Sequence, residues 1–202
     1  EMVVSELPPV TEQVIQCDMS DEQAAVYEKE KSAVRNTILE NIESLGIDKS
    51  AIIVLQGLMR LRQLANHPVL TDEDYRGGSG KFDAVTHNIA NVVAEGHRIL
   101  IFSSFVKHLD LFPGWLEKNG IEYTMLTGST RERGKVIGNF RSNENIKVFL
   151  ISLKAGGVGL NLTEADYVFI LDPWWNPASE IQALSRAHRI GQEKRVFVFR
   201  YI

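Results

Sequence analysis

The segment RILIF, Arg98–Phe102, is a short and almost continuous apolar run, and four more runs of the same kind follow it. These runs are Glu122–Leu126, Lys147–Ile151, Tyr167–Leu171 and Arg195–Phe199, and helical patterns separate them. Strands that are apolar on both faces and alternate with helices are typical of a parallel sheet covered on both sides. From Lys81 onward, the sequence therefore predicts an α/β domain with helices on both faces of a parallel sheet.

The loops that follow these runs are the candidates for a site, because ligands of parallel sheets bind beyond the carboxyl ends of the strands. They are Ser103–Phe105, Thr127–Thr130, Ser152–Gly159 and Asp172–Pro177. The glycines at 156, 157 and 159 would let backbone N–H groups approach an anion. A tight turn is the alternative explanation for this glycine cluster.

The other loops also allow two interpretations each. Thr127–Thr130 offers donors for an anion just before a helix, although capping of that helix is an equally sufficient role. Lys154 is a point charge for a phosphate or an ordinary solvated lysine. Trp174 and Trp175 would present an indole to a sugar or base, and we expect at least one of them to be buried in the core.

The stretch QALSRAHRIGQ, Gln182–Gln192, predicts a helix with two arginines, with Asn176 as its cap and Pro177 in its first turn. Helical spacing places Gln182, Arg186 and Arg189 on one polar face. The stripe expected to pack is formed by Ile181, Leu184 and His188. Paired guanidiniums on a rigid element suit a phosphoryl group, whose oxygens match their planar forks. Two ordinary surface arginines are the alternative.

The first 75 residues indicate helices after an extended entry, in which Gln13–Asp18 alternates like a strand. Ser20 is the expected cap of a helix from Asp21 to Leu45, with Gly46 as its stop. A second helix, about Lys49–Ala65, is apolar almost all round and is therefore expected to be mostly buried. Arg76–Gly80 predicts a flexible joint.

Composition limits the classes of protein and of partner. Residues 1–125 carry 11 Lys/Arg against 19 Asp/Glu, whereas residues 126–202 carry 11 against 7. The basic end would face phosphate, and chance segregation of charge is the alternative. No apolar run is long enough for a membrane span, and no secretion signal is expected. The single cysteine, Cys17, fits a reducing cytoplasm. The five histidines show no metal-ligand spacing, and we predict no metal site in this chain.

A phosphate-binding loop of the G-x-x-x-x-G-K-[ST] type is missing from the sequence. Phe82 follows Gly80-Lys81, and Tyr75 stands where the first glycine would be. The acidic run Asp72–Asp74 does not follow a buried strand and is not expected to hold Mg²⁺. A pair of phosphate-binding arginines without a phosphate loop predicts half of a site, with the other half supplied by another domain.

Six motifs, in this order, resemble one family. They are LMRLRQLANHPVL, SGKFDAV, ILIFSSF, LTGSTRERGKVIGNF, SLKAGGVGLNLTEADYVFILDPWWNP and QALSRAHRIGQ. Together they resemble the second, C-terminal RecA-like lobe of Swi/Snf-type ATPases, the DNA translocases of helicase superfamily two. The resemblance covers nearly the whole chain and implies three parts: an inter-lobe linker at 1–20, a helical protrusion at 21–75 and the RecA-like lobe at 76–202. The short segment between Gly128 and Phe140 resembles bacterial members, and Ser185 is a departure at a position where the family often has aspartate or another residue.

The resemblance also implies roles for individual residues. Arg186 and Arg189 resemble arginine fingers that act on the γ-phosphate of ATP across a cleft between two lobes. Gln182 and the turn Gly157, Val158, Gly159 resemble elements that line this cleft. Contacts to a DNA backbone are implied for Ser103, Gly128, Ser129, Ser152, Lys154 and Trp175. ATP and Mg²⁺ would be bound mainly by the first lobe, upstream in the same polypeptide, and the partner would be double-stranded DNA.

Three functions remain compatible with these patterns. The first is a lobe of a motor ATPase that moves along duplex DNA, located in the cytoplasm and, in a bacterium, at the nucleoid. The second is a strand-separating helicase of another branch, against which the WWNP and RAHRIGQ strings argue. The third is a non-catalytic nucleic-acid or protein-binding module that kept the fold.

Overall fold

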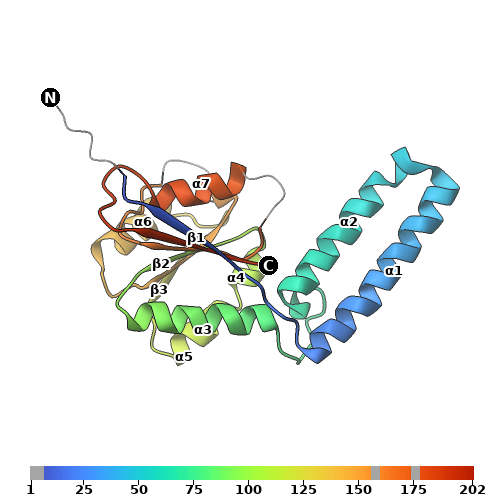
Figure 1. Ribbon diagram of the computed structural model, residues 1–202, viewed down its shortest axis with the longest axis horizontal. Helices are drawn as coiled ribbons and strands as arrows, with labels where there is room; N and C mark the ends of the chain where they lie inside the picture. Colours follow the sequence, from blue (N-terminus) through green and yellow to red (C-terminus); the bar gives the residue numbers. More distant parts are fainter. Residues whose placement is uncertain (1–6, 156–159, 174–177) are drawn as a thin grey trace. The chain divides into compact units, whose positions relative to one another are not determined.

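The computed structural model describes residues 7–155, 160–173 and 178–202, and within them the chain forms a six-stranded sheet (Figure 1). The strands are β1 (Val10–Ile15), β2 (Ile99–Ser103), β3 (Tyr123–Leu126), β4 (Val148–Ser152), β5 (Tyr167–Ile170) and β6 (Val196–Tyr201). Their order is β1-β6-β5-β2-β4-β3, and every neighbouring pair is parallel. The predicted parallel sheet is confirmed, and β2 to β6 begin at or just after the start of the predicted runs.

The strand β1 was placed wrongly by the sequence pattern. The alternation suggested Gln13–Asp18, whereas the strand runs from Val10 to Ile15 and pairs with β6, Val10 lying opposite Val196. Most of its side chains are exposed because β1 is the edge strand, so its apolar pattern is weak. Part of the segment expected to be a linker therefore completes the sheet.

Helices cover both faces of the sheet, as predicted. The helices α3 (Gly80–Ala94) and α5 (Phe112–Lys118) lie on one side in Figure 1, and α6 (Arg133–Ser142) and α7 (Ala178–Ala187) lie on the other. A short helix, α4 (Val106–Leu109), follows β2. On the α6 and α7 side, Phe102, Phe149 and Ile170 of the strands form one buried cluster with Phe140 of α6 and Ala183 of α7.

The opposite face of the sheet carries an aromatic ladder. Tyr167 stacks on Phe197 with ring centroids 4.9 Å apart, and Phe169 stacks on Phe199 at 5.2 Å. Tyr201 lies edge-on to Phe169, and its hydroxyl accepts a hydrogen bond of 3.0 Å from Asn88 Nδ2 on α3. Such aromatic contacts add to the area that the sheet and α3 bury.

Residues 17–84 form a second compact unit, separate from the unit made of residues 1–16 and 85–202. It holds α1 (Asp21–Leu45), α2 (Ile47–Asn66) and a 3₁₀ turn, η1 (Pro68–Leu70). The expected caps of α1 are confirmed: Ser20 Oγ accepts from the N–H of Gln23 at 3.2 Å, and the N–H of Gly46 donates to the carbonyl of Ile42. The division into linker, protrusion and lobe stays a prediction.

The expectation that α2 is mostly buried is wrong. Ile52 is 67% exposed and Leu55 is 54% exposed, and Leu58 and Met59 are exposed as well. The physical reason is that α2 packs on α1 through one narrow stripe, where Val34 lies so close to Gly57 that a side chain at 57 would collide with it. A helix in a two-helix hairpin buries one side only, whatever its remaining residues are.

The expected flexible joint at Arg76–Gly80 is partly wrong, because its end is packed. Ser79 is buried and its hydroxyl donates to the carbonyl of Asn66 at 2.7 Å. The N–H of Gly80 donates to Gln23 Oε1 at 3.1 Å, and a Cβ at this position would lie 1.7 Å from the carbonyl oxygen of Asp18. Glycine is required here for close approach of two backbones rather than for flexibility.

Candidate functional site

The first residues of the predicted site loops lie together at one end of the strands, because the carboxyl ends of parallel strands are on the same side of the sheet. The N–H of Leu153, after β4, donates to the carbonyl of Ser103 at the end of β2. The buried carboxylate of Asp172, after β5, accepts two hydrogen bonds of 3.1 and 3.0 Å from the N–H of Ser104. These bonds tie three loops into one surface. Asp172 was predicted only as the first residue of a candidate loop, without a role of its own.

Two of the residues predicted to contact DNA are buried in this lobe. The hydroxyl of Ser103 accepts from the N–H of Phe105 at 3.0 Å and donates to the carbonyl of the same residue at 3.2 Å. The hydroxyl of Ser152 accepts from the N–H of Ala155 at 3.3 Å. Both side chains stabilise the turns that leave their strands, a local role that serine often has.

The turn after β3 presents an open surface. Thr127 is buried and its hydroxyl lies 2.9 Å from the hydroxyl of Ser129, whereas Gly128 and Ser129 are exposed. Thr130 Oγ1 accepts from the N–H of Thr127 at 3.0 Å, which fixes the turn. Gly128 and Ser129 therefore stand at the tip of a hydrogen-bonded turn, and the strand before this turn, β3, is the neighbour of β4, which ends at Ser152.

Lys154 is exposed on the loop that follows β4. The carbonyl of the next residue, Ala155, accepts a hydrogen bond from the Nη2 of Arg133 at the start of α6. Arg133 thus holds the base of the loop and leaves Lys154 facing solvent. The predicted glycine turn at 157–159, with Val158, and the predicted DNA contact Trp175 lie outside the described residues, as does the predicted cap Asn176.

The helix α7 carries Arg186, and its inward face differs in part from the one predicted. Arg186 is only 6% exposed, whereas Ile181 is 64% exposed. The residues that pack against the sheet are Ala183 and Ala187, with Leu184 partly buried beside them. Small side chains let the helix lie close to the strands, so its inward face is the alanine stripe. Because α7 ends at Ala187, Arg189 also leaves the helical spacing from which its direction was predicted.

Arg186 and Arg189 bring two positive charges close together, and Arg186 has no counter-charge among the described residues. Arg186 Nε is buried and makes no hydrogen bond with the part of the chain that the structure describes. Burial lowers the pKa of Arg186, and the charge of Arg189 lowers it further. Arg189 itself is exposed. A buried donor without an acceptor is costly, and an anion bound here would supply the acceptor and the opposite charge.

A hydrogen-bonded triad that the sequence analysis missed anchors the first turn of α7. Arg200 of β6 donates from Nε to Glu180 Oε2 at 2.7 Å and from Nη1 to Glu12 Oε2 at 2.6 Å. Desolvation by itself would lower the pKa of Arg200, but the hydrogen bonds and charges of the two glutamates outweigh it and raise the pKa. An arginine inside the apolar strand VFVFRY was the available signal, because such a charge is buried only with partners.

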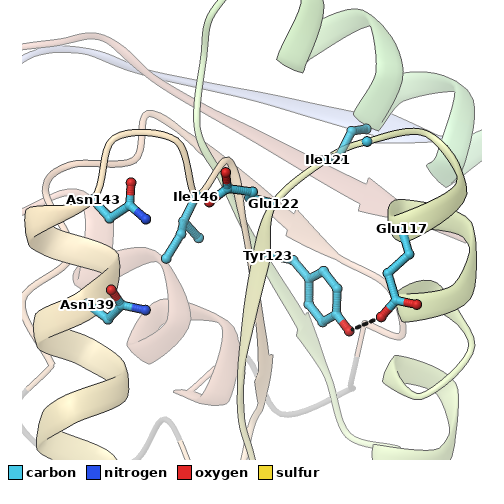
Figure 2. Close-up of a pocket in the computed structure, with 8 residues that line it drawn as sticks. Glu117, Ile121, Glu122, Tyr123, Asn139, Asn143 and Ile146 are labelled. Carbon is cyan, nitrogen blue, oxygen red and sulfur yellow. Dashed lines mark hydrogen bonds between the residues drawn. The ribbon is translucent and has the colours of Figure 1, made fainter.

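Two surface depressions lie at the opposite end of the strands. One of roughly 480 Å³ surrounds the start of β3, where Tyr123 donates to Glu117 Oε1 at 2.8 Å (Figure 2). This hydrogen bond, burial and the charge of Glu117 raise the pKa of Tyr123. Asn139 of α6 and Asn143, the residue after this helix, line the same depression. A second, of about 350 Å³, includes Lys194. Neither contains a predicted site residue.

No group of three or more His, Cys, Asp or Glu side chains is arranged to hold a metal ion within the described ranges. In the same residues, no helix combines the length and the apolar character needed to cross a membrane.

Residues 80–191 match the helicase conserved C-terminal domain. This match covers more than half of the chain, and the chain belongs to this family. Within it, the similarity is to Swi2/Snf2-type ATPases.

Two curated relatives illustrate this similarity. The chain is 37% identical to the mouse (Mus musculus) SWI/SNF-related matrix-associated actin-dependent regulator of chromatin subfamily A member 1, covering 99% of this chain and 20% of that protein. It is 35% identical to the nuclear protein STH1/NPS1 of Saccharomyces cerevisiae, covering 99% of this chain and 16% of that protein. The chain therefore spans a fifth or less of the length of these relatives.

The fold is also that of solved structures. The Sulfolobus solfataricus SWI2/SNF2 ATPase core in complex with dsDNA has a TM-score of 0.81 and 32% identity, covering 98% of this chain and 42% of that one. The C-terminal domain of the same archaeal ATPase has a TM-score of 0.76 and 30% identity, covering 95% of this chain and 78% of that one. The RecA-like character of the sheet is thereby confirmed.

Proposed function

We propose that this chain is the second ATPase lobe of a Swi2/Snf2-type translocase of double-stranded DNA, in which Arg186 and Arg189 complete the ATP site. The first lobe, elsewhere in the same polypeptide, would bind most of ATP and its Mg²⁺. The observation that carries the proposal is the arginine pair itself, in which the buried Nε of Arg186 lacks an acceptor among the described residues. A phosphoryl group arriving from another lobe has the charge and the oxygens that this pair requires.

The arginines would stabilise negative charge on the phosphoryl group and would not form or break a covalent bond themselves. In phosphoryl transfer the charge spreads over the equatorial oxygens, and a planar guanidinium stabilises it without taking or giving a proton. Gln182 is exposed on α7 near the pair. We assign Gln182 and the turn of Gly157, Val158 and Gly159 to the lining of the same cleft. No step is assigned to Mg²⁺, because the described residues offer it no ligand set.

DNA would be bound at the carboxyl edge of the sheet. Lys154, Gly128 and Ser129 are exposed there and suit a phosphate backbone, which carries no sequence information and so suits a motor. Ser103 and Ser152 are weaker candidates, because their hydroxyls would have to leave existing bonds with their own turns. Trp175 is kept as a predicted contact. The archaeal relative solved with dsDNA supports this partner.

The finer assignments of origin and location also remain predictions. The short segment between Gly128 and Phe140 suggested a bacterial protein of the cytoplasm, associated with the nucleoid. The curated relatives reported above are eukaryotic, so they give this assignment no support.

The proposal is tested by ATP hydrolysis in the full-length polypeptide with and without duplex DNA. We expect DNA to stimulate hydrolysis strongly, and we expect displacement of a third strand from a triplex without separation of the duplex strands. Separation of the duplex would identify a strand-separating helicase instead. Binding of DNA without any ATP hydrolysis would identify a non-catalytic module on the same fold.

A further inference from the structure

The helix α7 has few apolar contacts with which to fix its position. It is ten residues long, and the side chains that it buries against the strands include two alanines, Ala183 and Ala187. Helices of this length are marginal by themselves, so tertiary contacts must hold them. Alanine side chains offer little area and few interlocking shapes, and polar contacts at the helix ends therefore weigh more in setting its position.

The N-terminal strand supplies such contacts at both ends of α7. At the first turn, Glu180 accepts from Arg200, and Arg200 also donates to Glu12 of β1. Just after the last turn, His188 Nε2 lies 2.8 Å from the carbonyl oxygen of Pro8, the second residue before β1. A carbonyl only accepts, so Nε2 carries the proton and donates.

The two contacts are equally spaced along the strand and the helix. Eight residues separate Glu180 from His188, a rise of about 12 Å in a helix. Four residues separate Glu12 from Pro8, about 13 Å in an extended chain. The segment from Pro8 to Glu12 therefore runs alongside α7 in the opposite direction and is matched to its length.

The burial of Glu180 makes the stability of α7 sensitive to the ion pair with Arg200. The side chain of Glu180 is about as buried as that of a core residue, whereas Glu12 is half exposed. A buried carboxylate that loses its cation is strongly destabilising, so Arg200 constrains the place of Glu180 closely. Its two charge-assisted bonds are geometrically specific, because the guanidinium is planar.

We propose that β1 positions the arginine helix, and that Glu12, Arg200, Glu180 and His188 are positioning residues for Arg186 and Arg189. A movement of the chain before Val10 would shift the Pro8 carbonyl and Glu12. Their contacts with His188 and, through Arg200, with Glu180 would then move the two ends of α7. The inference rests on the proposed function for its effect on catalysis, but the mechanical link itself does not.

The test uses Arg200→Met and Glu12→Gln in the full-length protein, with Arg141→Met as the matched control. Arg141 forms an exposed ion pair with Glu164, at 3.0 Å, that does not involve β1 or α7. Both hydrolysis and amide hydrogen exchange are measured. We expect Arg200→Met to lower DNA-stimulated kcat roughly 10- to 100-fold, the range known for misplaced catalytic groups, while the KM for ATP changes less than about twofold. Glu12→Gln should lower kcat less, and Arg141→Met should not lower it.

Hydrogen exchange separates positioning from general loss of structure. In Arg200→Met, exchange should become faster in residues 181–188 and stay unchanged in α3. Arg200→Lys should restore only part of kcat, because an ammonium lacks the planar fork that reaches both glutamates. Unchanged exchange in α7 overturns the mechanical link, whatever the role of the arginines.

The kinetic outcomes keep the two hypotheses apart. If Arg189→Ala abolishes hydrolysis and Arg200→Met leaves kcat unchanged, the positioning inference is wrong and the proposed function stands. If exchange in α7 rises in Arg200→Met while Arg189→Ala hydrolyses ATP normally, the mechanical link stands and the finger assignment is wrong.

Discussion

At the scale of single residues, Arg186 and Arg189 show what sequence spacing conveys and what it omits. Their spacing predicted two arginines on one element, and the structure has them at and just beyond the end of α7. The direction of each side chain was not predictable, because Ala183 and Ala187 compete with Ile181 and Leu184 for the inward face. Close approach to the strands favours the small residues, a tertiary effect that no helical wheel contains.

The burial of Arg186 leads to a prediction about stability. Because its folded pKa is lowered, the charged form is less favourable in the folded chain than in the unfolded one. The guanidinium is charged throughout the usual pH range, so Arg186 destabilises the isolated lobe at every such pH. Arg186→Met keeps the packing stem and removes the charge, and we expect it to raise Tm by on the order of 2–4 °C.

Thermal melting of this 202-residue chain, with Arg189→Met as the control, checks the prediction. Arg189 is exposed, so its replacement should leave Tm nearly unchanged. A melting point several degrees lower in Arg186→Met would mean that Arg186 is a structural residue of the fold. A substitution that stabilises the fold by removing a side chain commonly indicates that this side chain serves activity rather than stability.

At the scale of elements, buried strands were easier to predict than helices. Runs such as Lys147–Ile151 are apolar on both faces because both faces are covered, so their pattern depends little on details of packing. The helix α2 is also apolar almost all round, but in this helix the pattern does not indicate burial, because Ile52 and Leu55 are exposed. Edge strand β1 was misplaced because an exposed edge leaves a weak pattern.

The turn after α2 gives a pH-dependent prediction. His67 Nδ1 accepts from the N–H of Val69 and so caps η1. Burial lowers the pKa of His67, and the charge of Asp83 acts in the opposite direction without reversing this shift. The folded state therefore favours the neutral ring, and the unfolded state binds the proton first as the pH falls. The neutral His67 ring therefore contributes to the free energy of unfolding. This contribution is complete above the ordinary pKa of 6.5 and is lost as the pH falls toward the lower pKa of the folded state.

Urea unfolding between about pH 7.5 and 5.5 measures this effect against His67→Asn, which keeps a capping acceptor and does not titrate. The free energy of unfolding of the original protein should fall more steeply, by at most about 1.4 kcal/mol per pH unit, the slope for one proton. Parallel curves for the two proteins would show that His67 is not responsible.

At the scale of the whole molecule, the site is an open surface. The predicted DNA contacts Gly128, Ser129 and Lys154 are exposed at one edge of the sheet, and the depressions near Tyr123 and Lys194 are at the other. From the sequence, the missing phosphate loop already predicted half of a site. The arginine inside VFVFRY indicated a buried charge with partners, but the partners Glu12 and Glu180 could not be predicted, because they come from other segments of the chain.

The same placement predicts how the chain binds DNA. We expect weak binding of duplex DNA, with little sequence preference and a steep dependence on salt, because backbone contacts dominate. Lys154→Ala should lower affinity equally for different sequences and flatten the salt dependence by about one phosphate contact. Lys194→Ala removes the same charge at the opposite edge and should change neither. Fluorescence anisotropy at several salt concentrations measures both, and equal effects of the two variants would contradict the assigned edge.

The central claim is that this lobe contributes arginines to hydrolysis at a site completed by another lobe, and ATP turnover by the full-length Arg189→Ala variant tests it most directly. Arg189 is exposed, so its loss should not disturb the fold. We predict that DNA-stimulated kcat falls about 10³-fold or more, the contribution of such arginines in related hydrolases, while ATP binding changes far less. Arg189→Lys should not restore activity, because a point charge lacks the planar fork. ATP hydrolysis at the original rate in Arg189→Ala would contradict the claim.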